Sequence, residues 1–128
     1  MPAESFAAVA LVVLGLLAVF QIALALGAPL GHLAWGGQHE VLPARLRAGS
    51  VVSVVLYALF AAVIADRAGL VDLVPDAVAS VGTWILVGYF ALGIVMNAIS
   101  RSVPERWVMV PVCAVLAGCC VVVALSAA

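Results

Sequence analysis

The sequence predicts an all-α polytopic membrane protein, a four-transmembrane-helix antiparallel bundle in which residues 1–128 form a single domain. Of the 128 residues, 68% are hydrophobic and only 9% are charged, and the mean hydropathy is +1.37. Soluble domains are usually about 45–50% apolar and about 25% charged, so this chain has too little polar surface to cover a soluble core. The apolar residues also gather in four long runs separated by short polar segments, which is typical of membrane-spanning helices.

The four apolar runs define the predicted spans, at residues 6–26, 48–65, 78–99 and 107–125. At about 1.5 Å per residue, the first run extends roughly 30 Å and matches one hydrocarbon core. A cleaved signal peptide would have a basic start and an apolar stretch of about 7–15 residues. This segment instead begins with Glu4, carries no Lys or Arg and is longer. We therefore expect a retained helix.

Residues that favour the start of a helix precede the other three runs. Pro43 lies just before the second run, where an entering chain accepts a proline, and Asp76 suits the N-terminal end of the third. Ser102 and Glu105 have capping-box spacing before the fourth run, and Pro104 fits its first turn. These features support three further helices at the predicted positions.

The distribution of arginine predicts an orientation. Four of the five basic residues lie in the first and third connections, residues 27–47 and 100–106, and one lies in the second. Because cytoplasmic loops are enriched in Lys and Arg, we expect these two connections in the cytoplasm and both termini outside. Frequent Ala, Val and Arg with no Lys suggest a bacterial source, hence the inner cell membrane. The arginines of the first and third connections are Arg45, Arg47, Arg101 and Arg106, and that of the second is Arg67.

Polar side chains of the different spans fall on inward helix faces and lie at similar depths in the membrane. A period of 3.6 residues per turn places them on shared faces, and polar groups inside a membrane tend to face the interior of the bundle. The pattern predicts a polar pocket that opens to the cytoplasm and has two tyrosines at its floor. The candidate ligand-binding residues from the spans are Gln21, Ser53, Tyr57, Tyr89 and Asn97, with Ser50 on the same face as Ser53.

These residues have a second possible role, which is interhelical hydrogen bonding. Ser, Asn and Gln commonly join membrane helices, at about 0.6–2 kcal/mol for each bond. A packed tyrosine can likewise place its hydroxyl on a partner. The sequence leaves both roles open.

The connection 27–47 is the longest polar segment. Its glycines and prolines break a regular helix, and its interleaved Leu, Trp and Val predict that it lies at the membrane interface or dips into the bundle. We expect it to cover the pocket, with charged residues of the third connection at the mouth. The candidate ligand-binding residues here are His32, Trp35, His39 and Glu40, together with Arg101 and Arg106 at the mouth beside Glu105.

Several kinds of chemistry find little support in the sequence. Two histidines and a glutamate could hold a metal ion, but His32, His39 and Glu40 do not have the spacing of a known ligand motif, and we predict no metal site. A Ser-His-Asp set and a phosphate loop are absent. No predicted span carries an acid, which counts against proton-coupled transport. The arginines also have a simpler role, as topology determinants and lipid-phosphate contacts.

Composition sets further limits on the function. The net charge of −1 offers no basic face for nucleic acid, and the sequence identifies no cofactor. The three cysteines lack C-x-x-C spacing, so we predict that they serve as small apolar residues of the last helix. They are Cys113, Cys119 and Cys120.

Two segments, GAPLGHLAWGGQHEVLPARLR and NAISRSVPER, resemble a set of small four-helix bacterial integral membrane proteins of unassigned function. The resemblance covers most of the chain and implies the same fold, but it carries over no catalytic or binding residue. The chain does not resemble the small multidrug transporters, whose first helix carries an acid where this one has only Gln21. It also lacks the motifs of fluoride channels and of quinone-coupled thiol oxidoreductases.

Three hypotheses for function follow. The leading one is a non-enzymatic membrane protein that binds a partner subunit, a lipid or a small molecule through the pocket, because polar residues converge there and no catalytic set does. The second is a homo-oligomeric transporter or channel in the lipid bilayer, with Gly82, Ala114 and Gly118 allowing close contact between copies. The third is a membrane-embedded enzyme that uses the connection 27–47.

Overall fold

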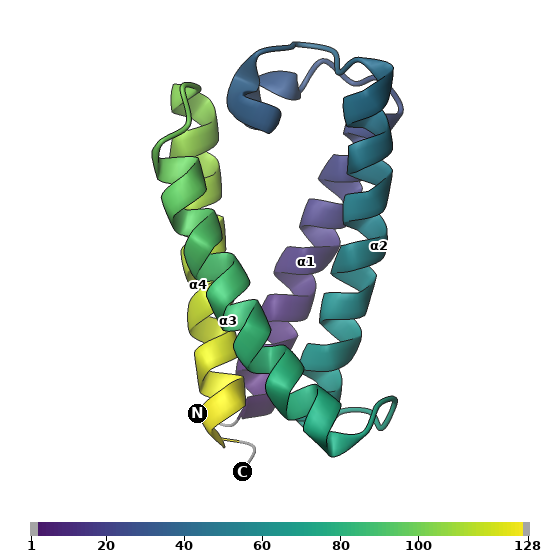
Figure 1. Ribbon diagram of the computed structural model, residues 1–128, viewed down its shortest axis with the longest axis vertical. Coiled ribbons are helices and arrows are strands. Elements are labelled where there is room, and N and C mark those ends of the chain that lie inside the picture. The colour runs from purple at the N-terminus through teal and green to yellow at the C-terminus, as the bar shows by residue number, and fades with distance from the viewer. Residues whose placement is uncertain (1–2, 127–128) are drawn as a thin grey trace.

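A computed structural model describes residues 3–126 and shows four long helices joined by short connections (Figure 1). Each helix has 23 or 24 residues and is long and apolar enough to cross a membrane. Residues 3–126 contain no strand, so the predicted all-α class is confirmed. The helices are α1 (Ala3–Ala25), α2 (Ala44–Arg67), α3 (Asp76–Ala98) and α4 (Val103–Ser126), and two 3₁₀ turns, η1 (Gly31–Leu33) and η2 (Trp35–Gly37), lie between α1 and α2.

Two helices begin several residues before the apolar runs that predicted them. α2 begins at Ala44 rather than at residue 48, with Pro43 in extended backbone (φ −67°, ψ 163°) at the N-cap position. α4 begins at Val103 rather than at residue 107, because the Ser102 hydroxyl oxygen accepts a hydrogen bond from the Glu105 N–H at 3.3 Å. Polar end turns are helical without being apolar, so an apolar run underestimates the length of the helix. The first connection is correspondingly shorter than predicted, and we call its residues 26–43 the cover segment.

The helices form two hairpins, α1–α2 and α3–α4, and each helix packs most closely against its partner in the hairpin. The hairpins meet at the end that holds the α2–α3 connection (Figure 1). They separate toward the end that holds the cover segment and the α3–α4 connection. The predicted bundle is therefore closed at one end and open at the other.

An apolar core joins the two hairpins at the closed end. Ala7 and Ala10 of α1 are fully buried, and their small size lets the helices approach closely. Gly82, which the sequence suggested for contact between copies, instead lies against Val63 of α2, where an added Cβ would come within 3.0 Å of Val63 Cγ1. The other buried residues of this core are Leu14, Ile64, Leu86, Phe90, Leu116, Cys119, Cys120 and Val123.

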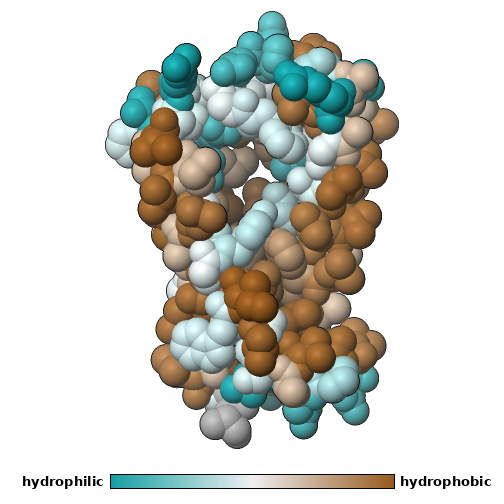
Figure 2. Space-filling model, in the orientation of Figure 1, coloured by the Kyte–Doolittle hydropathy of each residue, from teal (hydrophilic) through white to brown (hydrophobic). Residues whose placement is uncertain are grey.

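The outer surface of the helices is apolar between two polar ends (Figure 2). Val12, Leu16 and Val19 show the extent of this surface, with exposed fractions of 62%, 66% and 64%. So large an apolar surface is unfavourable in water and favourable in hydrocarbon. The arrangement fits a multi-pass membrane protein.

Asp66 fastens the α2–α3 connection at the closed end. It is buried in the last turn of α2, where its Oδ2 accepts hydrogen bonds from the N–H groups of Leu73 at 2.6 Å and Val74 at 2.9 Å. The adjacent Arg67 donates from Nη2 to the carbonyl oxygen of Ala124 in α4, at 2.9 Å. The end of α2 is thereby tied both to the connection and to the other hairpin.

Asp66→Asn is expected to lower the free energy of unfolding by about 1 kcal/mol, because a neutral amide oxygen accepts hydrogen bonds less strongly than a carboxylate. Asp72→Asn removes the same charge from an exposed position of the connection and should change stability little. Titration with SDS in mixed micelles, followed by circular dichroism, measures both variants. Equal losses would show that net charge, rather than the two hydrogen bonds, sets stability at this end.

Candidate functional site

A cavity of about 490 Å³ lies between the two hairpins at their open end. Figure 2 shows the hollow beneath the cover segment. The volume falls within the roughly 300–1,000 Å³ of ligand pockets. All four helices and the cover segment contribute to its lining, through Leu17, Gln21, Leu33, Ala34, Trp35, Ser53, Tyr57, Tyr89, Phe90, Leu92, Gly93, Met96, Asn97, Glu105, Met109, Val112, Cys113 and Leu116.

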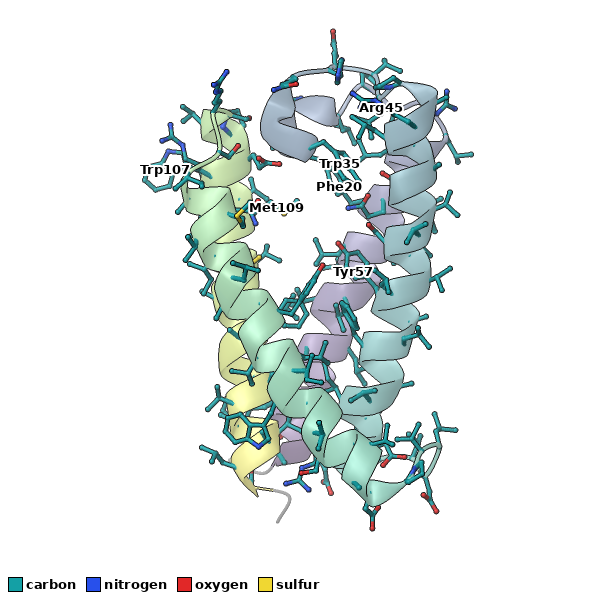
Figure 3. All side chains as sticks on the ribbon, viewed as in Figure 1. Phe20, Trp35, Arg45, Tyr57, Trp107 and Met109 are labelled. Carbon is teal, nitrogen blue, oxygen red and sulfur yellow. The ribbon has the colours of Figure 1, made fainter. Side chains whose placement is uncertain are left out.

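The polar residues that helix periodicity placed on inward faces meet at this cavity. Gln21 of α1, Ser53 and Tyr57 of α2, and Tyr89 and Asn97 of α3 all line it. Ser53 and Tyr57 are about one helical turn apart, and Tyr89 and Asn97 are about two turns apart, so each pair shares one face. In Figure 3, Tyr57 points from α2 into the space between the hairpins.

Aromatic packing fixes the floor of the cavity. The ring of Phe60 lies edge-on to Tyr89, with centroids 5.2 Å apart, and Tyr89 packs against Phe90 at 5.3 Å in the same manner. Edge-to-face contacts of this kind are favourable and restrict the rings. Tyr89 therefore has a defined place in the wall, although 48% of its surface is exposed.

The polar residues of the wall bond little across the helices. The Asn97 amide donates to a carbonyl oxygen of its own helix at 2.7 Å and to Cys113 Sγ of α4 at 3.6 Å. The Ser53 hydroxyl donates within its own helix, at 3.0 Å. Gln21 lies beside Tyr57, yet its Oε1 is buried without a hydrogen-bond partner in the described part of the chain. Interhelical hydrogen bonding therefore accounts for the Asn97–Cys113 contact but leaves the Gln21 oxygen unexplained.

Trp35 anchors the cover segment to α2. Its Nε1 donates to Ser50 Oγ at 3.4 Å, and its indole lies over Gly49, where an added Cβ would come within 2.9 Å of Trp35 Cη2. The backbone of Trp35 is left-handed, with φ of 52°, a conformation that costs a non-glycine residue roughly 1–2 kcal/mol. The strained residue directs its indole from the cover segment toward the cavity (Figure 3).

The cover segment also reaches the other hairpin. The Gly36 N–H donates to Glu105 Oε2 of α4 at 3.4 Å, and the Ser102 hydroxyl donates to the carbonyl oxygen of His32. Gly37 has a φ of 71° and lies so close to Ser102 that a Cβ would not fit. Because the cover segment is bonded to α2 on one side and to the start of α4 on the other, it holds the open ends of the hairpins together.

Glu105 is a site residue that the predicted candidate set omits. The sequence indicated a helix-start residue near the mouth, but Glu105 is only 5% exposed and lines the cavity. The Ser100 hydroxyl donates to its Oε1. The predicted spans carry no acid, but the helices of the structure extend beyond those spans, and α4, which begins at Val103, includes Glu105. Helical spacing could have identified Glu105, since it shares a face with Met109, Val112 and Leu116.

The other predicted residues lie outside the cavity. The cover segment folds back on itself, with the Gly31 N–H donating to the Glu40 carbonyl oxygen at 2.8 Å. Within residues 3–126, no three His, Cys, Asp or Glu side chains gather closely enough to hold a metal ion. The residues that do not line the cavity are His32, Glu40, Arg101 and Arg106, which are exposed, and His39, which is half-buried.

Comparison of the chain with protein families, with curated proteins and with solved structures gave no match. The geometry of the cavity is therefore the basis for a proposed function.

Proposed function

We propose that the chain is a multi-pass integral membrane protein that binds a small amphipathic organic molecule in the cavity between its hairpins. The observation that carries this proposal is the cavity of about 490 Å³, with largely apolar walls and a few inward-facing polar groups. Ligand sites have this composition, because the apolar walls supply affinity and the polar groups fix orientation.

Gln21 gives a second reason to expect a ligand. Its Oε1 is buried without a hydrogen-bond partner in residues 3–126, and an unpaired buried acceptor costs about 1–3 kcal/mol. A ligand donor or an ordered water at the wall would offset this cost. The amide thus marks where a polar part of the ligand would bind.

In the proposed orientation, the open end faces the cytoplasm of a bacterial cell. Four arginines lie at the open end and Arg67 lies at the closed end, an asymmetry that the positive-inside rule associates with a cytoplasmic open end. A ligand would then enter from the cytoplasm or from the inner leaflet of the membrane.

Binding is favoured over passage through a single copy. Leu14, Ile64 and Leu116 belong to the core at the closed end, and each is at most 2% exposed. Transport would require the hairpins to separate there against this packing. The enzymatic alternative relied on His32, His39 and Glu40, which lie outside the cavity.

Filling the cavity tests the proposal. Ser53→Phe places an aromatic ring in the wall, and we expect it to weaken the binding of triphenylphosphine oxide, a neutral aromatic probe, by roughly tenfold or more, because the ring takes the space that the probe needs. Binding is measured through Trp35 fluorescence in a Trp84→Phe, Trp107→Phe background, in which Trp35 is the only tryptophan.

Val52→Phe is the matched control, since Val52 is 56% exposed and its neighbour Ser53 lines the cavity. This variant should bind the probe as the unaltered protein does. Equal binding by the two variants, or no binding by the unaltered protein, would contradict the proposed function.

A further inference from the structure

We propose that the cavity selects an organic cation, a molecule with apolar or aromatic groups around one positive centre, and that Glu105 is its counter-ion. The proposal rests on the proposed function and specifies the class of ligand. Three features of the wall support this proposal. They are the buried carboxylate of Glu105, a set of aromatic rings, and the buried acceptor Gln21 Oε1, which has no hydrogen-bond partner in residues 3–126.

Glu105 is a buried carboxylate whose hydrogen-bond partners within residues 3–126 are neutral groups. Its hydrogen-bond partners are the Gly36 N–H, at 3.4 Å, and the Ser100 hydroxyl. Its place in the first turn of α4 adds the favourable end of the helix dipole. A carboxylate with 5% exposure is nevertheless poorly compensated by neutral donors, because burial removes most of its hydration. A positive charge in the cavity would complete the compensation.

The chain's own basic groups do not supply that charge. The chain has no Lys. Arg47 donates from Nε to the Ala25 carbonyl oxygen at 2.8 Å, and Arg67 lies at the closed end. No Arg or His is among the cavity-lining residues, so the lining carries one acid and no base. The remaining arginines, Arg45, Arg101 and Arg106, are exposed, and within residues 3–126 none of them donates a hydrogen bond to Glu105.

The rest of the wall suits a cation with apolar groups. Four aromatic side chains line the cavity, and the face of an aromatic ring attracts a cation, most strongly where water is excluded. Two polarisable methionines add to the wall. Gln21 Oε1, an acceptor without a partner in residues 3–126, presents the negative end of a dipole. The aromatic and methionine residues are Trp35, Tyr57, Tyr89, Phe90, Met96 and Met109.

Probes of one shape and different charge test the selection. Tetraphenylphosphonium and tetraphenylborate differ in the sign of their charge, and triphenylphosphine oxide is a neutral relative. Trp35 fluorescence in the single-tryptophan background reports occupancy of the cavity rather than partition into the micelle. We expect tetraphenylphosphonium to bind roughly tenfold or more tightly than tetraphenylborate.

Glu105→Gln should weaken the binding of tetraphenylphosphonium by roughly tenfold or more and leave that of triphenylphosphine oxide within about twofold, because it removes the charge and nearly preserves the shape. Glu40→Gln removes an acid at the same end of the molecule, from an exposed residue outside the cavity, and should change neither. Ser100→Ala removes a hydrogen bond to Glu105 but keeps the charge, so any effect on binding should be of similar size for all three probes.

The outcomes separate this proposal from the proposed function. If both ions bind equally and Glu105→Gln changes neither, the selection of cations is wrong while cavity binding, tested by Ser53→Phe, stands. If Glu105→Gln weakens the neutral probe as much as the cation, Glu105 only fastens the cover segment and the proposal is overturned. If Glu105→Gln does not fold, the unaltered protein still tests the proposal, because equal binding of tetraphenylphosphonium and tetraphenylborate would overturn it. If no probe responds to Ser53→Phe, both proposals fail.

Discussion

Gly31→Ala is expected to release the cover segment and to accelerate hydrogen exchange of its amides about a hundredfold. An added Cβ would overlap the carbonyl oxygen of His39 and lie 2.8 Å from that of Glu40. Both are backbone atoms, so no side chain can rotate away to make room. Any shift that admits the methyl group also breaks the bond from the Gly31 N–H to the Glu40 carbonyl oxygen.

The size of this effect follows from the rigidity of the contact. Inserting a methyl group into a well-packed site costs up to about 3 kcal/mol, which corresponds to a factor of about a hundred in the population of the closed cover segment. Hydrogen exchange followed by mass spectrometry resolves the segment from the helices. Exchange in the closed-end core should be unchanged, because Gly31 lies at the opposite end of the molecule.

Gly88→Ala is the control for this prediction. A Cβ at Gly88 would meet no atom within 4 Å, so the same change in α3 should leave exchange in the cover segment unaltered. Unaltered exchange in Gly31→Ala as well would mean that the contact between residues 31 and 40 does not hold the segment. The proposed ligand site would then lack a stable cover.

Helix periodicity was sufficient to predict most of the polar residues that the helices contribute to the cavity wall. Gln21, Tyr57 and Asn97 were assigned to inward faces from their spacing alone, and all three line the cavity. Depth could also be predicted, because helices that cross one bilayer have similar lengths and position along one helix corresponds to position along the next. Regular structure and a fixed thickness together define the level at which side chains meet.

The cover segment could not be predicted in this way. Gly36 and Glu105 are 69 residues apart and meet through a turn that has no period, in which Gly36 and Gly37 adopt φ of 79° and 71°. A hydropathy pattern does not place such a turn against a particular helix face. Spacing therefore indicates a helix-start residue near the mouth at Glu105, but it does not predict that Gly36 and Ser100 donate hydrogen bonds to its carboxylate.

The separation of the hairpins also depends on contacts that spacing does not predict. Ala7 and Ala10 are buried at the closed end, where they allow α1 to pack closely. At the open end, the indole of Trp35 and the rest of the cover segment lie between the hairpins. The sizes of side chains in non-local contacts therefore decide where the bundle opens.

Leu116→Ala is expected to lower the free energy of unfolding by about 2–3 kcal/mol. Leu116 is fully buried, belongs to the core at the closed end, and also lines the cavity. In a membrane the side chain lies in hydrocarbon in both the folded and the unfolded state, so the loss comes from packing contacts and the new void rather than from hydration. The expected loss accordingly lies at the lower end of the 2–5 kcal/mol found for buried Leu→Ala changes.

Leu59→Ala removes the same atoms from a position that is 57% exposed, and it should change stability by less than about 0.5 kcal/mol. SDS titration of the two variants in mixed micelles, followed by circular dichroism, gives the comparison. Equal losses would mean that the closed end is not a packed core. A loss of stability in Leu116→Ala alone would show that the core at the closed end holds the two hairpins together. The cover segment would then be the second connection between the hairpins, at the open end. A ligand could then enter by displacing the cover segment while the core at the closed end stays packed.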